Sequence, residues 1–197
     1  MHLSTSANKN TLFKRIKNLW FKVIGNAADY TLEARIFHSI SIALVLLGMF
    51  YLPYNFFAGL YVAAASCILL AGFFYFQYYN SRFRKKPHSN AAVALAGILI
   101  FSVNYFSNSG INGSTDLIWP SYLVLVIAIS PYRQHLLWVF VYVVAFFILH
   151  LIEYHYPWLV KHPFDLGKGE FIDRITAFPL PIISITIVIS FLRRNYD

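Results

Sequence analysis

Six long apolar runs dominate this sequence, and their length limits the folds that the chain can adopt. We place these runs over residues 34–52, 55–79, 90–107, 115–130, 134–152 and 173–192. The hydrocarbon core of a bilayer is about 30 Å deep, and a helix needs about 20 residues to cross it. The runs also lack the strict alternation of β-barrel strands. The sequence therefore predicts an all-α, polytopic membrane domain of six transmembrane helices over residues 30–197.

The composition agrees with a membrane location. Of the 197 residues, 58% are apolar and 12% are charged, whereas soluble domains are about 25% charged. The chain has 16 basic and 8 acidic residues, a net charge of +8, and these charges lie between the apolar runs. Because this distribution is typical of membrane loops, we expect the lipid bilayer as a partner and no nucleic acid.

The basic residues also predict the orientation of the domain. They precede the first run, separate the second from the third and the fourth from the fifth, and follow the sixth. With six crossings, all of these groups fall on one side of the membrane. The positive-inside rule then places both termini in the cytoplasm, as a multi-pass protein of the inner (cytoplasmic) membrane.

The N-terminal segment, residues 1–29, is expected to be cytoplasmic and to contain an amphipathic helix over 11–24. Its apolar residues recur at helical spacing: Leu12, Ile16, Leu19, Trp20 and Val23. Lysine and arginine side chains lie largely off this stripe. A basic amphipathic helix with a tryptophan favours the lipid headgroup plane. The alternative is a soluble helix packed on a partner domain.

A polar group near the outer ends of the last two runs predicts a ligand site. His150, Glu153 and Tyr154 share one helical face, and Trp158 follows them in the longest outer loop. The remaining candidates are Asp173 and Arg174 at the mouth of the sixth run and Trp119 in the fourth. Ionisable groups at membrane depth suggest function, and we expect a small-molecule or lipid ligand. Interfacial snorkelling and an aromatic belt are the alternative explanation.

Two further pairs are candidates for coupling a signal to the cytoplasm. Pro179 and Pro181 each remove a helical hydrogen bond within the sixth run, which predicts a kink in the outer half of the bilayer. The freed carbonyls need a partner, such as Thr176, a water or a ligand. Glu33 and Arg35 stand at the start of the first run, where they favour either an ionic network or simple helix-entry charge.

No catalytic motif is visible, so we do not expect an enzyme. The sequence has no Gly-rich phosphate loop, no HExxH and no GxSxG. It has one cysteine, Cys67, and no Cys/His cluster, so we expect no metal site and no cofactor. His38 and His150 are the membrane-embedded histidines, and their positions near opposite sides are poorly suited to a shared haem iron.

The layout resembles the N-terminal membrane-embedded input domain of bacterial sensor histidine kinases. Three segments carry the resemblance: the entry YTLEARIF at 30–37, the Asn-Ser-Gly loop at 108–110 and the Arg-Arg exit at 193–194. The resemblance implies a homodimer that senses a signal in or across the membrane. It further implies a cytoplasmic kinase or other output module after residue 197, moved by the last helix.

Two other functions remain open on the sequence. The first is a small standalone transporter or channel, although the runs carry few charges for an ion pathway. The second is a structural subunit of a larger membrane complex.

Overall fold

The computed structural model describes residues 22–164 and 167–193, and these residues form helices joined by turns and loops, with no strand among them. The all-α prediction is confirmed. Seven α-helices are described: α2 (Leu32–Phe57), α3 (Tyr61–Phe83), α4 (Asn90–Ser107), α5 (Thr115–Ile129), α6 (Tyr132–His155), α7 (Lys168–Ala177) and α8 (Pro179–Arg193). Two 3-10 turns, η1 (Gly110–Asn112) and η2 (Pro157–Leu159), lie in the connections.

Five helical segments are long and apolar enough to cross a membrane, so the multi-pass prediction is confirmed. They are α2, α3, α4, α6 and the combined segment Lys168–Ser190. Helix α5 is apolar but shorter, at 15 residues or about 22 Å. The amphipathic helix expected over 11–24 falls mainly outside the described residues, and only its last turn, 22–24, is described as helical.

Several boundaries differ from the predictions, and the largest difference is at the second run, where α3 begins at Tyr61 and not at residue 55. We expected the first run to stop at Pro53, but α2 continues to Phe57. A proline lacks only its own N–H, and the Ala58 N–H closes the last turn on the carbonyls of Tyr54 and Phe56. The last segment begins at Lys168, five residues earlier than expected.

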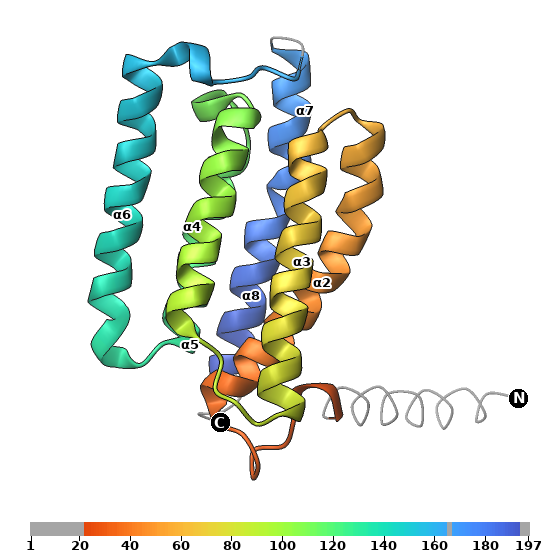
Figure 1. Cartoon of the computed structure of the whole chain (residues 1–197), viewed down its shortest axis with the longest axis vertical. Coiled ribbons are helices and arrows are strands. Elements are labelled where there is room, and N and C mark those ends of the chain that lie inside the picture. Colours follow the sequence, from red (N-terminus) through yellow and green to blue (C-terminus); the bar gives the residue numbers. More distant parts are fainter. Residues whose placement is uncertain (1–21, 165–166, 194–197) are drawn as a thin grey trace, which may run out of the picture.

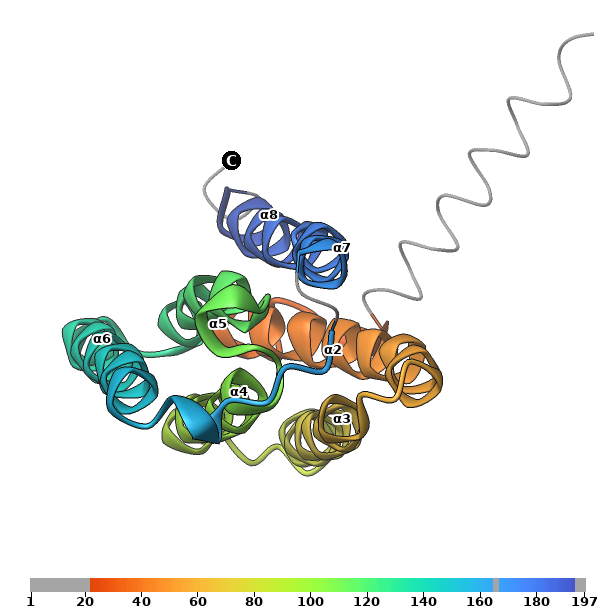
Figure 2. The ribbon, with the colours of Figure 1, turned by 90° about the horizontal axis from the view of Figure 1, so that it is seen from above.

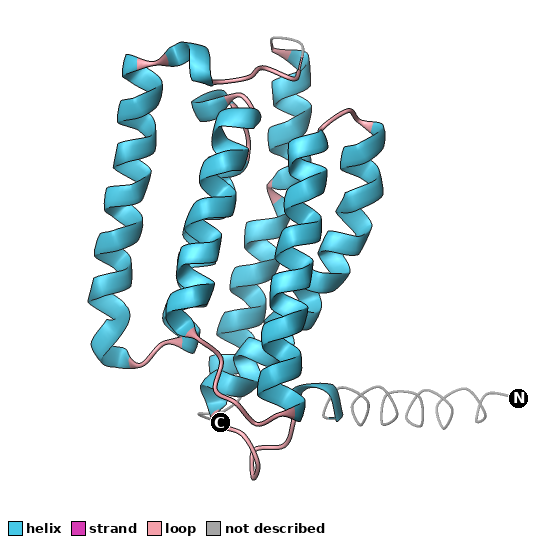
Figure 3. Cartoon of the chain, viewed as in Figure 1, coloured by secondary structure: helices cyan, strands magenta, loops and turns pink. Residues whose placement is uncertain are grey.

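The helices form antiparallel columns in three rows (Figures 1, 2 and 3). Viewed along the columns, α6, α4 and α3 form one row, α5 and α2 the middle row, and α7 with α8 the third (Figure 2). Residues 22–30, the α3–α4 loop and the end of α8 lie at one end, here called the collar end (Figure 1). The α2–α3 turn, η1 and the α6–α7 connection lie at the other, here called the strap end.

Helix α5 lies at the centre of the core. It packs against α2, α4, α6 and α8. Tyr122 on α5 donates to the Val93 carbonyl at 2.8 Å, and Tyr142 on α6 donates to the Ala94 carbonyl at 3.0 Å. A Cβ atom at Gly97 would lie 2.1 Å from the Tyr122 ring. The glycine on α4 therefore makes room for the tyrosine that fixes the centre of the bundle.

Candidate functional site

The loop between α4 and α5 forms the centre of the strap end. Its sequence, NSGINGSTD, turns sharply, because Ser109 and Gly110 both adopt a positive φ. The Asn112 N–H then donates to the Ser109 carbonyl at 3.0 Å, which closes the η1 turn. The turn presents the backbone N–H of Ile111 toward α6 and the carbonyls of Ile111 and Gly113 toward α7.

Glu153 ties α6 to this loop. Its carboxylate accepts from the Tyr105 hydroxyl on α4 and from the Ile111 N–H, the latter at 3.2 Å. Gly110 lies directly beside it, and a Cβ atom there would approach the carboxylate to 2.5 Å. The position therefore needs glycine both for its φ of +54° and for the closeness of Glu153.

Arg174 ties α7 to the same loop from the other side. Its guanidinium donates to the carbonyls of Ile111 and Gly113, and it makes a two-pronged ion pair with Asp116, both N–O distances being 3.3 Å. Both side chains are partly shielded from solvent, at 36% and 21% exposed. A planar guanidinium matched to a carboxylate holds direction as well as charge.

Asp173, the neighbour of Arg174, makes the third link. Its carboxylate accepts from the Asn108 amide at 3.2 Å and from the side chain and backbone of Ser114. The strap-end network is defined here as Tyr105, Asn108, Asp116, Glu153, Asp173 and Arg174. It joins α4, α5, α6 and α7 around one loop, and a polar ligand would compete for its hydrogen bonds.

The structure brings together three of the seven residues predicted for the ligand site: Glu153, Asp173 and Arg174. His150 lies one turn below Glu153, where its Nδ1 donates to the Phe146 carbonyl at 2.8 Å and its ring lies 5.1 Å from that of Tyr105. Trp119 is a core residue, 5% exposed, and donates to the Tyr142 carbonyl at 3.4 Å.

Tyr154 and Trp158 lie away from the network. They are 80% and 72% exposed, as residues of an interfacial aromatic belt would be. Sequence reasoning did not include Tyr105, Asn108 and Asp116 among the site residues. Two features of the sequence could have identified some of them: the composition of the α4–α5 loop and the opposite charges of Asp116 and Arg174.

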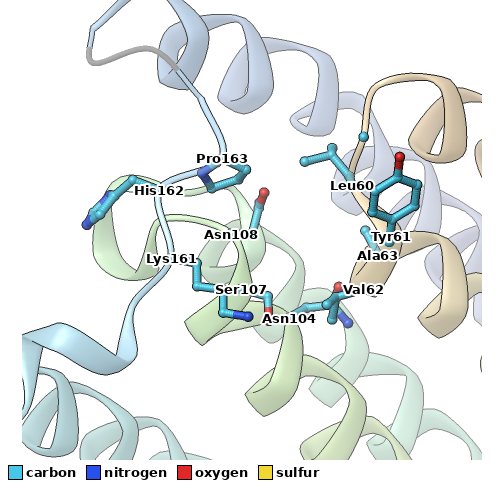
Figure 4. Close-up of a pocket in the computed structure, with 11 residues that line it drawn as sticks. Leu60, Tyr61, Val62, Ala63, Asn104, Ser107, Asn108, Lys161, His162 and Pro163 are labelled. Carbon is cyan, nitrogen blue, oxygen red and sulfur yellow. The ribbon is translucent and has the colours of Figure 1, made fainter.

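The α6–α7 connection is pinned across the end of α4. Its described part, residues 156–164, is here called the strap. The Lys161 N–H donates to the Phe106 carbonyl at 2.7 Å, and the Ser109 N–H donates to the Lys161 carbonyl at 2.9 Å. A cavity of about 290 Å³ lies beneath the strap (Figure 4). None of the predicted site residues lines it.

A second polar cluster, here called the collar, holds residues 22–24 against α2 and α3. Arg82 donates to the carbonyls of Lys22 (2.8 Å) and Val23 (3.2 Å). Tyr78 donates to Val23 at 3.0 Å, and the fully buried His38 contacts the Ile24 carbonyl through Nδ1 at 2.7 Å. A carbonyl only accepts, so Nδ1 carries the proton. The collar thereby caps the C-terminal end of the helical turn at 22–24.

Of the predicted coupling residues, two lie at the collar end and two lie within the column formed by α7 and α8. Glu33 is exposed in the first turn of α2, whereas Arg35 is 9% exposed. Pro179 is the first residue of α8, and only Phe178, which keeps helical φ and ψ, separates it from the end of α7 at Ala177. This junction, here called the break, lies where the sequence predicts the kink. Thr176 donates to the Ile172 and Asp173 carbonyls, so it does not take the role we expected toward the freed carbonyls.

His88 lies at the collar end in the α3–α4 loop. Its ring stacks on Phe37 at 4.2 Å with the planes 9° apart. Burial lowers the pKa of His88, while hydrogen bonds to the Ile129 backbone and the Asn90 side chain and the charge of Glu33 oppose that shift. His88 is therefore held neutral near pH 7.

No metal site is formed by the residues described. Within 22–164 and 167–193, no three His, Cys, Asp or Glu side chains gather closely enough to hold an ion. The chain matches no protein-family model, and neither a curated protein nor a solved structure resembles it significantly.

Proposed function

We propose that this chain is the membrane-embedded signal-input domain of a two-component sensor. It crosses the inner membrane six times, with the shorter α5 as the fourth crossing, and passes a signal to a cytoplasmic output module through α8. The chain itself is non-catalytic and works as a homodimer. The resemblance to sensor kinase input domains supports the proposal, as does the polar network at the strap end.

The distribution of charge supports the orientation. Among the described residues, the collar end carries Lys22, Arg35, Arg82, Arg84, Lys85, Lys86, Arg133 and Arg193 against two acids, Asp29 and Glu33. The strap end carries Asp116, Glu153, Glu170 and Asp173 against Lys161, Lys168 and Arg174. The positive-inside rule places the collar end in the cytoplasm.

One observation carries the proposed mechanism: the strap-end network holds the last turn of α7, directly before the break at Phe178. Asp173 and Arg174 are the residues held, and the Phe178 N–H still donates to the Arg174 carbonyl at 3.0 Å. Beyond the break, α8 packs mainly on α5 and runs to the collar end. A change in the grip on α7 therefore reaches the cytoplasmic end through one helix, with the break as the pivot.

A ligand drives this change only if it binds two positions of α7 with different affinity. At the strap end, the bonds to compete for are those from Arg174 to Gly113 and Asp116. The mechanism follows: an outer-side polar ligand loosens or tightens these bonds, α7 shifts, and the far end of α8 moves. Helix shifts of about 1–2 Å are typical of such switches.

Releasing the grip by mutation tests the mechanism without a known ligand. The chain, with Cys67→Ser, carries spin labels at Tyr132→Cys and Arg193→Cys, both exposed positions at the collar end. In lipid nanodiscs, Arg174→Ala is expected to shift the mean label distance by about 2 Å. Lys168→Ala, which removes an exposed cation from the same helix, is the matched control and should leave the distance unchanged.

Identical distances in the wild type and Arg174→Ala would contradict the coupling.

The input-domain assignment has its own test, the size of the protein in its cells. An antibody against residues 4–17 should detect a band far above the 22.7 kDa of this chain. A band near 22.7 kDa would overturn the input-domain proposal.

A further inference from the structure

We infer that the cavity beneath the strap binds a small oxyanion, a phosphate or carboxylate group. Its volume of about 290 Å³ is just below the usual range for drug-sized ligands, about 300–1,000 Å³. The lining comes from the α2–α3 turn and the start of α3, the end of α4, and the strap: Gly59, Leu60, Tyr61, Val62, Ala63, Asn104, Ser107, Asn108, Lys161, His162 and Pro163. None of these lining residues is acidic.

Lys161 supplies the positive charge, and its backbone is fixed on both sides. Its N–H and carbonyl are the two groups that pin the strap to Phe106 and Ser109. Figure 4 shows its side chain running toward Ser107 and Asn104. The ring of His162 points away from the cavity and lies 3.8 Å from the Glu170 carboxylate. Lys161, an exposed residue, is therefore the cation at the edge of the cavity.

The opposite wall adds donors. It is the first turn of the 23-residue helix α3, whose cap, Leu60, makes no side-chain hydrogen bond. The N–H groups of Tyr61, Val62 and Ala63 are thus left for a partner, at the positive end of the helix dipole. A lysine ammonium and a helix terminus facing each other across one cavity favour an oxyanion between them.

The Asn104 side chain, which also lines the cavity, restricts the chemical class of the ligand further. Both N–H bonds of the Asn104 amide are donated, to Ser66 at 2.7 Å and to Ile100 at 2.8 Å. Only its oxygen is left, and this atom accepts from a ligand hydroxyl. Hydrogen phosphate, a hydroxy acid or a lipid headgroup that carries a hydroxyl meets that requirement.

Occupation of the cavity has a route to the signalling network, and this step alone rests on the proposed function. Asn108 lines the cavity while its amide donates to Asp173 on α7. Ligand binding at Lys161 would therefore act next to the Asn108–Asp173 hydrogen bond, one of the two links that hold α7. Binding of the anion does not require that link.

The test is a phosphate titration of the purified chain in a nonionic, phosphate-free detergent, with chloride at equal ionic strength as the reference. Saturable stabilisation against unfolding is expected in the wild type and in Lys168→Gln. Lys161→Gln should weaken binding at least about ten-fold, Lys161→Arg should retain it, and Ala63→Leu should abolish it by filling the cavity without changing charge. Equal unfolding temperatures in chloride alone show that the variants are folded.

Native mass spectrometry from anionic-lipid nanodiscs distinguishes the source of the anion. Saturation by free phosphate assigns a soluble ligand, and a phospholipid retained by the wild type but lost in Lys161→Gln assigns a lipid headgroup. If neither phosphate nor lipid distinguishes the wild type from Lys161→Gln, the anion site is wrong. The spin-label shift of Arg174→Ala would still stand in that case, so the two proposals fail separately.

Discussion

Arg82 is the residue on which the collar depends most. It donates to two carbonyls at residues 22 and 23, and its Nη1 donates to the Tyr30 hydroxyl at 2.8 Å. Hydrogen bonds to charged groups contribute about 1.5–3 kcal/mol each in favourable cases. Arg82→Ala should therefore release the segment 22–30 while the bundle stays folded. We expect hydrogen exchange at the Asp29 and Tyr30 amides to accelerate about ten-fold or more.

Arg84→Ala is the control for this prediction. Arg84 is an exposed neighbour whose guanidinium carbon lies 5.4 Å from the centroid of the Tyr79 ring. Removing it should leave exchange at residues 29 and 30 unchanged. Equal acceleration in both variants would show that general loss of positive charge, and not the collar, protects this segment.

Gly110 and Glu153 should behave as a coupled pair. Gly110→Ala places a methyl group 2.5 Å from the carboxylate and forces a positive φ on alanine, which alone costs about 1–2 kcal/mol. In a Glu153→Ala background the steric part vanishes and only the backbone part remains. A double-mutant cycle by thermal unfolding is expected to show this coupling. Additive losses would contradict the close packing of the loop on α6.

His88 gives the collar end a pH dependence. Its pKa lies below the ordinary value of 6.5, because burial disfavours the charged ring. As pH falls below about 6.5, the unfolded chain takes up the proton first, so stability is present above that pH and declines below it. The wild type should lose more thermal stability between pH 7 and pH 5 than His88→Gln does. The same slope in both proteins would assign the effect to other groups near His88, such as Glu33 and His38.

At the scale of elements, the break between α7 and α8 is expected to be the pivot of the molecule. Pro179 and Pro181 each withhold a helical N–H, and replacing both with alanine should let one helix run from α7 into α8. With labels at positions 132 and 193, the distance distribution is expected to narrow. Pro120→Ala is the control, because α5 continues through Pro120 without a break. An unchanged width in the double variant would mean that packing, not proline, sets the break.

The helices themselves were largely predictable from the sequence. A long apolar run predicts a transmembrane helix, so each helix could be predicted from the length of its run. The break before Pro179 could be predicted from the two prolines. The ends were less predictable, as Pro53 shows. Whether a proline ends a helix depends on what closes the last turn, here the Ala58 N–H, and that contact is not encoded in the proline.

The whole bundle predicts a labelling pattern that decides the number of crossings. In a Cys67→Ser background, Asn112→Cys at the strap end should react with an impermeant maleimide on intact cells. Lys85→Cys and Arg193→Cys at the collar end should react only after permeabilisation. Six crossings require this pattern because both collar positions share one side. Reaction of Arg193→Cys from outside would mean that one helical column does not cross.

The site was only half predictable at this scale. Glu153, Asp173 and Arg174 stood out because charged residues next to apolar runs are few. Their partners come from a loop some forty residues away from Glu153 in the chain, and its meeting with α6 and α7 is a product of the packing. The collar was missed for a related reason. Most of its hydrogen bonds are accepted by backbone carbonyls. Every residue has such a carbonyl, so the sequence does not show which of them a side chain will bind.

The shortness of α5 has a consequence for how the protein responds to the bilayer itself. Two neighbours of α5 are much longer helices, α2 at 26 residues and α6 at 24 residues, or about 39 Å and 36 Å. Hydrophobic mismatch is felt by surfaces that touch lipid. A thinner or thicker bilayer would therefore tilt the peripheral helices while the shielded centre keeps its place. A change in membrane thickness would in this way move the peripheral helices relative to the central helix α5 of the same molecule.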